Sequence, residues 1–205
     1  MRPSRRQDAR GPAVDVVIAS TRWSKAPQAA KLVRRTIAAA APARAQKAEL
    51  SVILTSNRAI GALNRQWRGQ DKPTNVLSFP APKQATKRTA KRAATRAAPR
   101  HLGDIVIAYE TTEREARAER KPFAHHLAHL AVHGFLHLVG YDHAADDEAD
   151  AMEGLETAIL ARLDVPDPYV ARGARAVSVS ETARDSLRLT RFLRRTASPL
   201  RRKML

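Results

Sequence analysis

Six of the seven histidines of this 205-residue chain lie between residues 125 and 143. His133 and His137 are four residues apart, so on an α-helix their side chains differ by only about 40° around the axis and lie about 6 Å apart. Gly140 allows the chain to turn, which would bring His143 back as a third ligand. Three imidazoles with an open fourth position are typical of a catalytic zinc site, which polarises an oxygen or lowers the pKa of water toward about 7. The spacing therefore predicts one zinc ion per chain, bound by these three histidines.

The same spacing, glycine included, occurs in the zinc-binding part of the metzincin protease motif H-E-x-x-H-x-x-G-x-x-H. Gly134 stands where that motif has its glutamate general base, so the ligands match and the peptidase base is missing. Either His133 or His137 alone would be better explained as a core histidine on an Ala/Leu face. The three histidines together favour a metal, and the glycine favours chemistry other than peptide cleavage.

Other polar residues near this motif are compatible with more than one role. His129 precedes His133 by one helical turn and is either a partner that orients a ligand or a packed side chain. His125 and His126 lie farther along the helix and are expected at the surface. Asp142 is close enough to orient a ligand or to replace one. Acidic residues also favour helix starts, and that explanation is preferred for Asp146, Asp147 and Glu148.

The formal net charge is +17, from 37 basic and 20 acidic residues, and such an excess usually means a polyanionic partner, nucleic acid first and an anionic membrane second. Three segments hold the whole excess, at residues 1–12, 83–100 and 171–205. We expect them to contact nucleic-acid phosphates without sequence preference. Of the rest, residues 13–82 are basic and 101–170 acidic, so the N-terminal half is expected to face the nucleic acid.

A chain of 205 residues is long enough for one domain with a sizeable core and short for two. We expect one domain over residues 14–170, with a basic insertion loop at 83–100, between a basic arm at 1–13 and a flexible tail at 171–205. The chain has no cysteine, so any zinc must be held by histidines and carboxylates. Neither a membrane-spanning apolar run nor a signal peptide is evident, which favours a cytoplasmic protein without a membrane partner.

The positioning elements follow from apolar periodicity, which predicts strands at residues 14–19, 50–55, 75–79 and 103–108. It also predicts helices at residues 27–41, 57–68, 109–121, 123–139 and 146–163. For the helix at 57–68, Ser56 is a typical N-cap residue and Gly69 a typical C-terminal glycine. One face of this helix would present Ile60, Leu63, Asn64 and Trp67. Early strands and late helices favour an α+β fold with a small sheet covered by helices. The zinc site would lie on the long helix 123–139 and the following turn.

Four stretches of the chain resemble the YbeY-type endoribonucleases, which are bacterial rRNA maturation factors. They are LNRQWRGQDKPTNVLSFP (Leu63 to Pro80), LGDIVIA (Leu102 to Ala108), the stretch His129 to Met152, and DPY (Asp167 to Tyr169). The third contains the signature HGxLHLxGYDH without a gap and is the most specific. The resemblance extends over about residues 14–170 and implies a small mixed sheet packed with helices.

The resemblance also implies site residues and partners. His133, His137 and His143 would bind zinc, and Arg68 would be the arginine that handles phosphate and supports activity. By chemistry alone, Arg68 would clamp a phosphodiester with two hydrogen bonds, and Lys72 on the same Gly/Pro loop would add a second positive charge. The implied partners are rRNA and the small ribosomal subunit, with ribosomal proteins and assembly GTPases as further ones.

We therefore expect a zinc-dependent, single-strand-specific endoribonuclease, with Arg68 and His133 as catalytic residues. The resemblance places its action in maturation of the 16S rRNA 3′ end and in ribosome quality control. Two alternatives stay open: a metal-dependent hydrolase of another substrate class, such as a metallopeptidase, and a non-catalytic ribosome-assembly factor with a structural zinc. A structural zinc normally has four protein ligands, whereas three are evident here.

Overall fold

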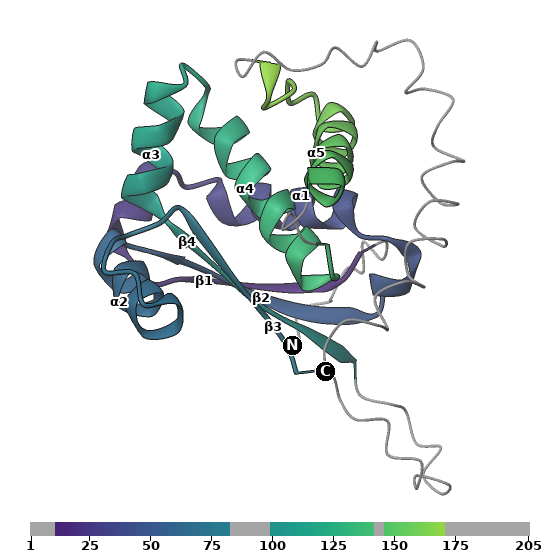
Figure 1. Ribbon diagram of the computed structural model, residues 1–205, viewed down its shortest axis with the longest axis horizontal. Helices are drawn as coiled ribbons and strands as arrows, with labels where there is room; N and C mark the ends of the chain where they lie inside the picture. The colour runs from purple at the N-terminus through teal and green to yellow at the C-terminus, as the bar shows by residue number, and fades with distance from the viewer. Residues whose placement is uncertain (1–10, 83–98, 142–145, 171–205) are drawn as a thin grey trace, which may run out of the picture. The chain divides into compact units, whose positions relative to one another are not determined.

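The computed structural model describes residues 11–82, 99–141 and 146–170 (Figure 1). All of its helices and strands belong to the unit that ends at Pro168, and of the second unit, Tyr169–Leu205, only the first two residues are described. Most of the basic arm, the insertion loop and the tail lie outside the described residues. So do Asp142 and His143.

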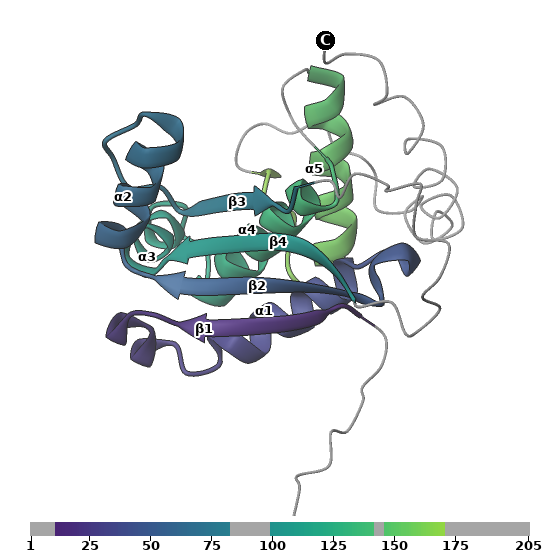
Figure 2. The same ribbon diagram turned by 90° about the horizontal axis from the view of Figure 1, so that it is seen from below.

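Four strands form one sheet in the order β1-β2-β4-β3, seen side by side in Figure 2. β1 (Ala13–Ile18), β2 (Ala48–Thr55) and β4 (Arg100–Ala108) run parallel, and β3 (Val76–Pro80) pairs antiparallel with β4 at one edge. Parallel strands need covered faces, and the two central strands are accordingly rich in buried Val, Ile and Leu. The expected α+β fold with a small mixed sheet is thus confirmed.

Most helices cover one face of this sheet. α1 (Ala29–Ala40) and α4 (Phe123–Leu138) pack on it, α3 (Tyr109–Ala118) lies beside α4, and α5 (Asp146–Ala161) packs against α4 (Figure 1). The connections include two short 3₁₀ turns, at Thr21–Lys25 and Ala43–Ala45. Ile105 and Ile107 of β4 point into this layer, where they join the main hydrophobic core with Phe135 of α4.

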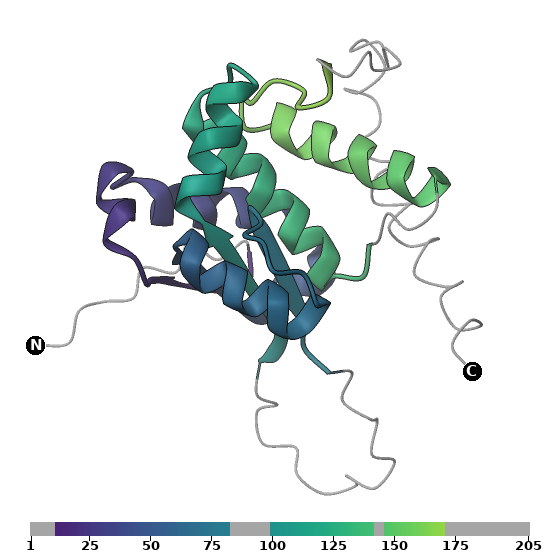
Figure 3. The same ribbon diagram turned by 60° about the vertical axis from the view of Figure 1, so that its left-hand side comes forward.

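One helix, α2 (Asn57–Arg68), covers the other face. Its Ile60 packs with Leu77, Val106 and Ala108, which alternate along their strands with the residues that face α4. Figure 3 brings α2 to the front, in blue. Edge strand β3 therefore has α4 on one face and α2 on the other.

The predicted bounds of α2 are confirmed, and Gly69 ends the helix with a φ of 67°. Ser56 occupies the N-cap position but its side chain makes no capping hydrogen bond; the backbone N–H of Asn57 instead donates to Glu110 Oε2 at 2.9 Å. Within the predicted stripe, Ile60 and Asn64 are buried and Leu63 is half-buried, whereas Trp67 is exposed.

Other boundaries shift for tertiary reasons. β4 starts at Arg100, three residues before the prediction, because its first residues pair with Ala48 and Glu49 of β2. α3 ends at Ala118, before the predicted residue 121, and Arg120 takes a left-handed φ of 53°. In the part of the chain that is described, no helix is both long and apolar enough to cross a membrane.

Candidate metal centre

The turn that follows α4 holds one of the predicted ligands in place. Gly140 has a φ of 98°, which favours glycine, and the Tyr141 N–H donates to the Leu136 carbonyl at 3.0 Å, closing the helix end. The same turn brings the Tyr141 carbonyl to His137, whose Nδ1 donates to it at 3.1 Å. Since a carbonyl only accepts, His137 carries its proton on Nδ1 and presents the lone pair of Nε2.

The other described ligand is oriented by a buried carboxylate from α5. Glu156 is fully buried, and its Oε1 accepts from His133 Nδ1 at 2.8 Å while its Oε2 accepts from His129 Nε2 at 2.8 Å. Burial acts to raise the pKa of Glu156, but the hydrogen bonds from the two histidines outweigh burial and lower the pKa to about 2. Glu156 is therefore ionised and accepts at Oε1, so the neutral form of His133 that donates through Nδ1 presents the lone pair of Nε2, as His137 does.

The two Nε2 atoms face each other across 3.2 Å, with ring centroids 4.7 Å apart. At this separation a proton on one Nε2 or a metal ion between the two lone pairs satisfies both nitrogens. Two zinc–nitrogen bonds of about 2.05 Å at a tetrahedral angle place their nitrogens about 3.3 Å apart. The residues present thus fit one divalent metal, with hydrogen bonds from their second nitrogens of the kind that orients metal-bound histidines.

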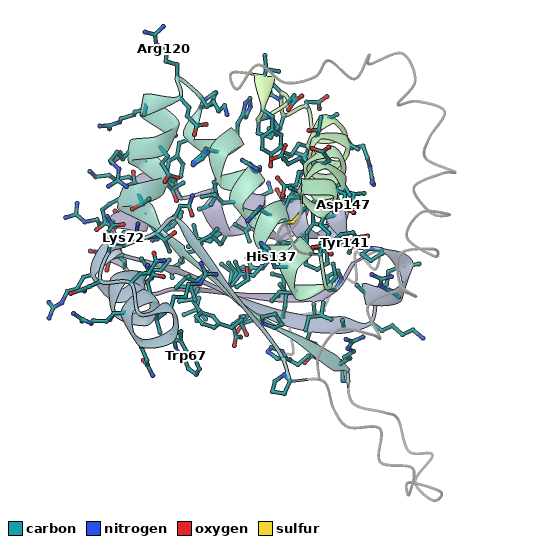
Figure 4. All side chains as sticks on the ribbon, in the orientation of Figure 1. Trp67, Lys72, Arg120, His137, Tyr141 and Asp147 are labelled. Atoms are coloured by element: carbon teal, nitrogen blue, oxygen red, sulfur yellow. The ribbon has the colours of Figure 1, made fainter. Side chains whose placement is uncertain are left out.

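The third predicted ligand, His143, lies outside the described residues, as does Asp142. Within the described ranges, no three metal-ligating side chains converge on one point. The structure therefore brings together two of the three predicted ligands. Figure 4 labels His137 on α4, and Tyr141 lies near the same end of that helix.

Gly134 is required by packing and excludes a protease-type base at this position. A Cβ there would lie 2.9 Å from Ile105 Cγ2 and 3.1 Å from Ser78 Oγ, and the Gly134 carbonyl accepts from that Ser78 hydroxyl at 3.1 Å. Residue 134 therefore lies in close contact with the sheet. A glutamate at residue 134 would clash with Ile105 and Ser78, which speaks against the metallopeptidase alternative.

The histidines that precede this pair have two different environments. His129 shares the carboxylate of Glu156 with His133, so its role as an orienting partner stays a prediction. The expectation that His126 is a surface residue is wrong: it is 5% exposed, and its Nε2 donates to Glu115 Oε2 at 3.0 Å, because α3 packs over this part of α4. His125 is half-buried.

The two predicted phosphate-binding residues lie on a different element. Arg68 is the last residue of α2 and Lys72 lies in the loop that follows; both are exposed. Asn64 Nδ2 donates to the Lys72 carbonyl at 2.8 Å and so ties this loop to the helix. Figure 4 shows Lys72 on the loop beside α2 and His137 on α4, so the two side chains come from separate elements.

Sequence reasoning missed Glu156, although one signal was present. Met152, Leu155, Ile159 and Leu160 form the buried stripe of α5, and Glu156 lies within that stripe four residues after the methionine. A single carboxylate on an apolar helical stripe needs a buried partner, and here the partners are two histidines.

The chain is similar to known proteins over most of its length. Residues 18–164 match the family described as endoribonuclease YbeY. A protein of that name from Bradyrhizobium sp. (strain BTAi1) is 54% identical over 164 residues, which cover 78% of this chain and 94% of the relative. Another, from Rhodopseudomonas palustris (strain BisA53), is 55% identical over 161 residues, covering 77% of this chain and 90% of the relative. A solution structure of a Thermotoga maritima protein covers 74% of this chain and 91% of its own, with 24% identity and a TM-score of 0.41. The family match and the two relatives establish that this chain belongs to the endoribonuclease YbeY family.

Proposed function

We propose that this protein is a zinc-dependent endoribonuclease that cleaves single-stranded RNA and acts in the cytoplasm on rRNA, in maturation of the 16S rRNA 3′ end and in ribosome quality control. The observation that carries the metal dependence is the pair of Nε2 atoms of His133 and His137, 3.2 Å apart and each oriented through its Nδ1. The RNA substrate is supported by the printed name of the family and by the net charge of +17.

In this mechanism His133 and His137, with His143, hold the zinc. When bound, zinc supplies a positive charge that stabilises the phosphodiester as negative charge develops on it. Glu156 keeps the proton of His133 on Nδ1, so that Nε2 stays available as a ligand. Arg68 binds a phosphate oxygen from the α2 side with its guanidinium. Lys72 adds charge beside it, and the basic arm, insertion loop and tail contact RNA backbone.

The test is internal cleavage of an RNA that is single-stranded in one sample and fully paired with its complement in the other. We expect cleavage of the single strand only, loss of cleavage with a chelator and recovery when zinc is returned, with about one zinc per chain by elemental analysis. A product that ends in a 2′,3′-cyclic phosphate would identify the 2′-OH as the attacking group. A protein that unfolds on chelation and cleaves no RNA when loaded would instead be an assembly factor with a structural zinc.

Arg68→Ala should lower the rate of RNA cleavage by about tenfold or more, equivalent to about 1.4 kcal/mol of lost stabilisation of the transition state. Zinc content should stay unchanged, because Arg68 is an exposed residue on α2 rather than on the histidine helix. Steady-state cleavage kinetics with parallel metal analysis measure both quantities.

The matched control is Arg65→Ala, which removes an arginine from the same last turn of α2. Arg65 is engaged with Asp71 at 3.0 Å, so we expect its loss to affect cleavage less. Equal rates for wild type and Arg68→Ala would remove Arg68 from the site.

A further inference from the structure

Trp67 is a large aromatic side chain that the fold leaves outside its core. It lies in the last turn of α2 and is 64% exposed, whereas the other tryptophan, Trp23, is 1% exposed. Trp67 packs edge-on against Phe79 of β3, with ring centroids 5.9 Å apart and an interplanar angle of 63°. Figure 4 shows it at the lower end of α2. Phe79 thus supports one edge of an indole that is mostly accessible.

The surroundings of Trp67 are positively charged. α2 contains three arginines and no acidic residue, and Arg68 is adjacent to the tryptophan. Lys72 is exposed on the next loop, and the acidic Asp71 there is paired with Arg65. An exposed indole beside free cationic groups is the combination with which proteins bind single-stranded nucleic acid, since every base has a face that can stack.

The strand order explains how the surface around Trp67 is related to the histidines of α4. β3 is an edge strand, so no further described strand blocks its outer side. Ser78 of β3 meets Gly134 of α4 on one face, and Phe79, the next residue, meets Trp67 on the other. A single strand of RNA that lies near the histidines can therefore cross the edge of β3 and reach the indole.

We propose that Trp67 is an RNA-binding residue that stacks on a base removed from the scissile position, with Phe79 holding the indole and Arg68 neutralising an adjoining phosphate. The inference rests on the proposed function, because it assumes that single-stranded RNA is the substrate. Trp67 contributes to binding and not to the chemical step. The group that stacks on Trp67 is a base of the RNA, and any of the four bases can stack there.

The first experiment compares variants in binding and cleavage of a long single-stranded RNA. Trp67→Ala should weaken binding and raise KM by about tenfold, while kcat at saturating RNA and zinc content stay unchanged. Trp67→Phe, which keeps a stacking ring, should recover most of the loss. Ile18→Ala is the matched control: Ile18 is 56% exposed on β1, at the opposite edge of the sheet, and its loss should change nothing. A short oligonucleotide that cannot span the edge of β3 should be bound equally by wild type and Trp67→Ala.

The second experiment uses the two tryptophans as probes. Acrylamide should quench the accessible Trp67 and spare the buried Trp23, so the wild-type signal reports on the proposed site. Binding of a single-stranded 2′-O-methyl oligonucleotide, which lacks the 2′-OH, should protect the quenchable fraction. RNA that binds and is cleaved while Trp67 stays fully quenchable, or Trp67→Ala that binds long RNA like wild type, overturns this inference and leaves the proposed function standing. A wild-type protein that binds no RNA overturns both.

Discussion

Replacing His133 and His137 together by alanine should remove the zinc and lower the rate of RNA cleavage by at least about a thousand-fold, since a metal stabilises the transition state by several kcal/mol and each 1.36 kcal/mol is a factor of ten. The reason is geometric. The two Nε2 atoms 3.2 Å apart supply two of the three predicted ligands, and one remaining imidazole cannot hold the ion. Elemental analysis of the purified variant and a single-turnover cleavage assay measure the two effects.

His125→Ala is the matched control for that variant. It removes a half-buried histidine from the same helix, two to three turns before the pair, and should keep both zinc and activity. A double variant that retains zinc at full stoichiometry would show that the metal lies elsewhere. Circular dichroism should show that both variants keep their helices.

Glu156→Gln should weaken zinc binding by about ten- to a hundred-fold while preserving the size and shape of the side chain. The buried carboxylate offers two acceptors to two N–H donors, on His129 and His133. An amide offers one acceptor and one donor, so one of these histidines must place its proton on the other nitrogen. If His133 does so, its Nε2 carries a hydrogen and cannot bind the metal.

The matched control for this variant is Glu115→Gln. Glu115 also accepts a hydrogen bond from a histidine of α4, His126, but at a distance from the metal ligands, and it accepts a second one from Asn75. We expect its zinc affinity to equal that of wild type. The measurement is competition with a chromophoric chelator, together with the melting temperature of each protein. Equal affinities for Glu156→Gln and wild type would contradict the assignment.

Sequence patterns predicted the bounds of a helix or strand best where a residue inside the pattern terminates the element. α2 has the predicted bounds because Gly69 supplies the left-handed residue that ends it. β4 begins earlier than predicted because Arg100 and His101 are polar and enter the sheet only by pairing with β2. Such pairing depends on a strand about fifty residues away, which local periodicity does not report.

In the candidate site, too, local spacing predicted some features, and others depended on tertiary packing. The spacing of His133 and His137 on one helix sufficed to predict that their side chains meet. Their common orienting group did not follow from spacing, because Glu156 comes from another helix and only tertiary packing brings it to α4. The burial of His126 was missed for the same reason: its distance from the pair along α4 says nothing about α3, which covers it.

The end of the sheet at which β3 and β4 are joined has a kinetic consequence. The first residue of α4, Phe123, lies beside Tyr109, with ring centroids 5.3 Å apart. Farther along the helix, Gly134 lies against Ile105 of β4. α4 therefore runs toward the end of the sheet at which Pro80 of β3 pairs with Gly103 of β4. The segment that connects β3 to β4 leaves and re-enters the sheet at this end. The described strand ends that flank residues 83–98, Pro80 of β3 and Arg100 of β4, therefore lie at the end of the sheet toward which α4 runs. Residues 83–100 carry seven basic and no acidic side chains. On the proposed function, we expect a polycation attached there to raise the local concentration of RNA and the rate of productive encounters, so that removing it lowers substrate capture and leaves the rate at saturating RNA unchanged.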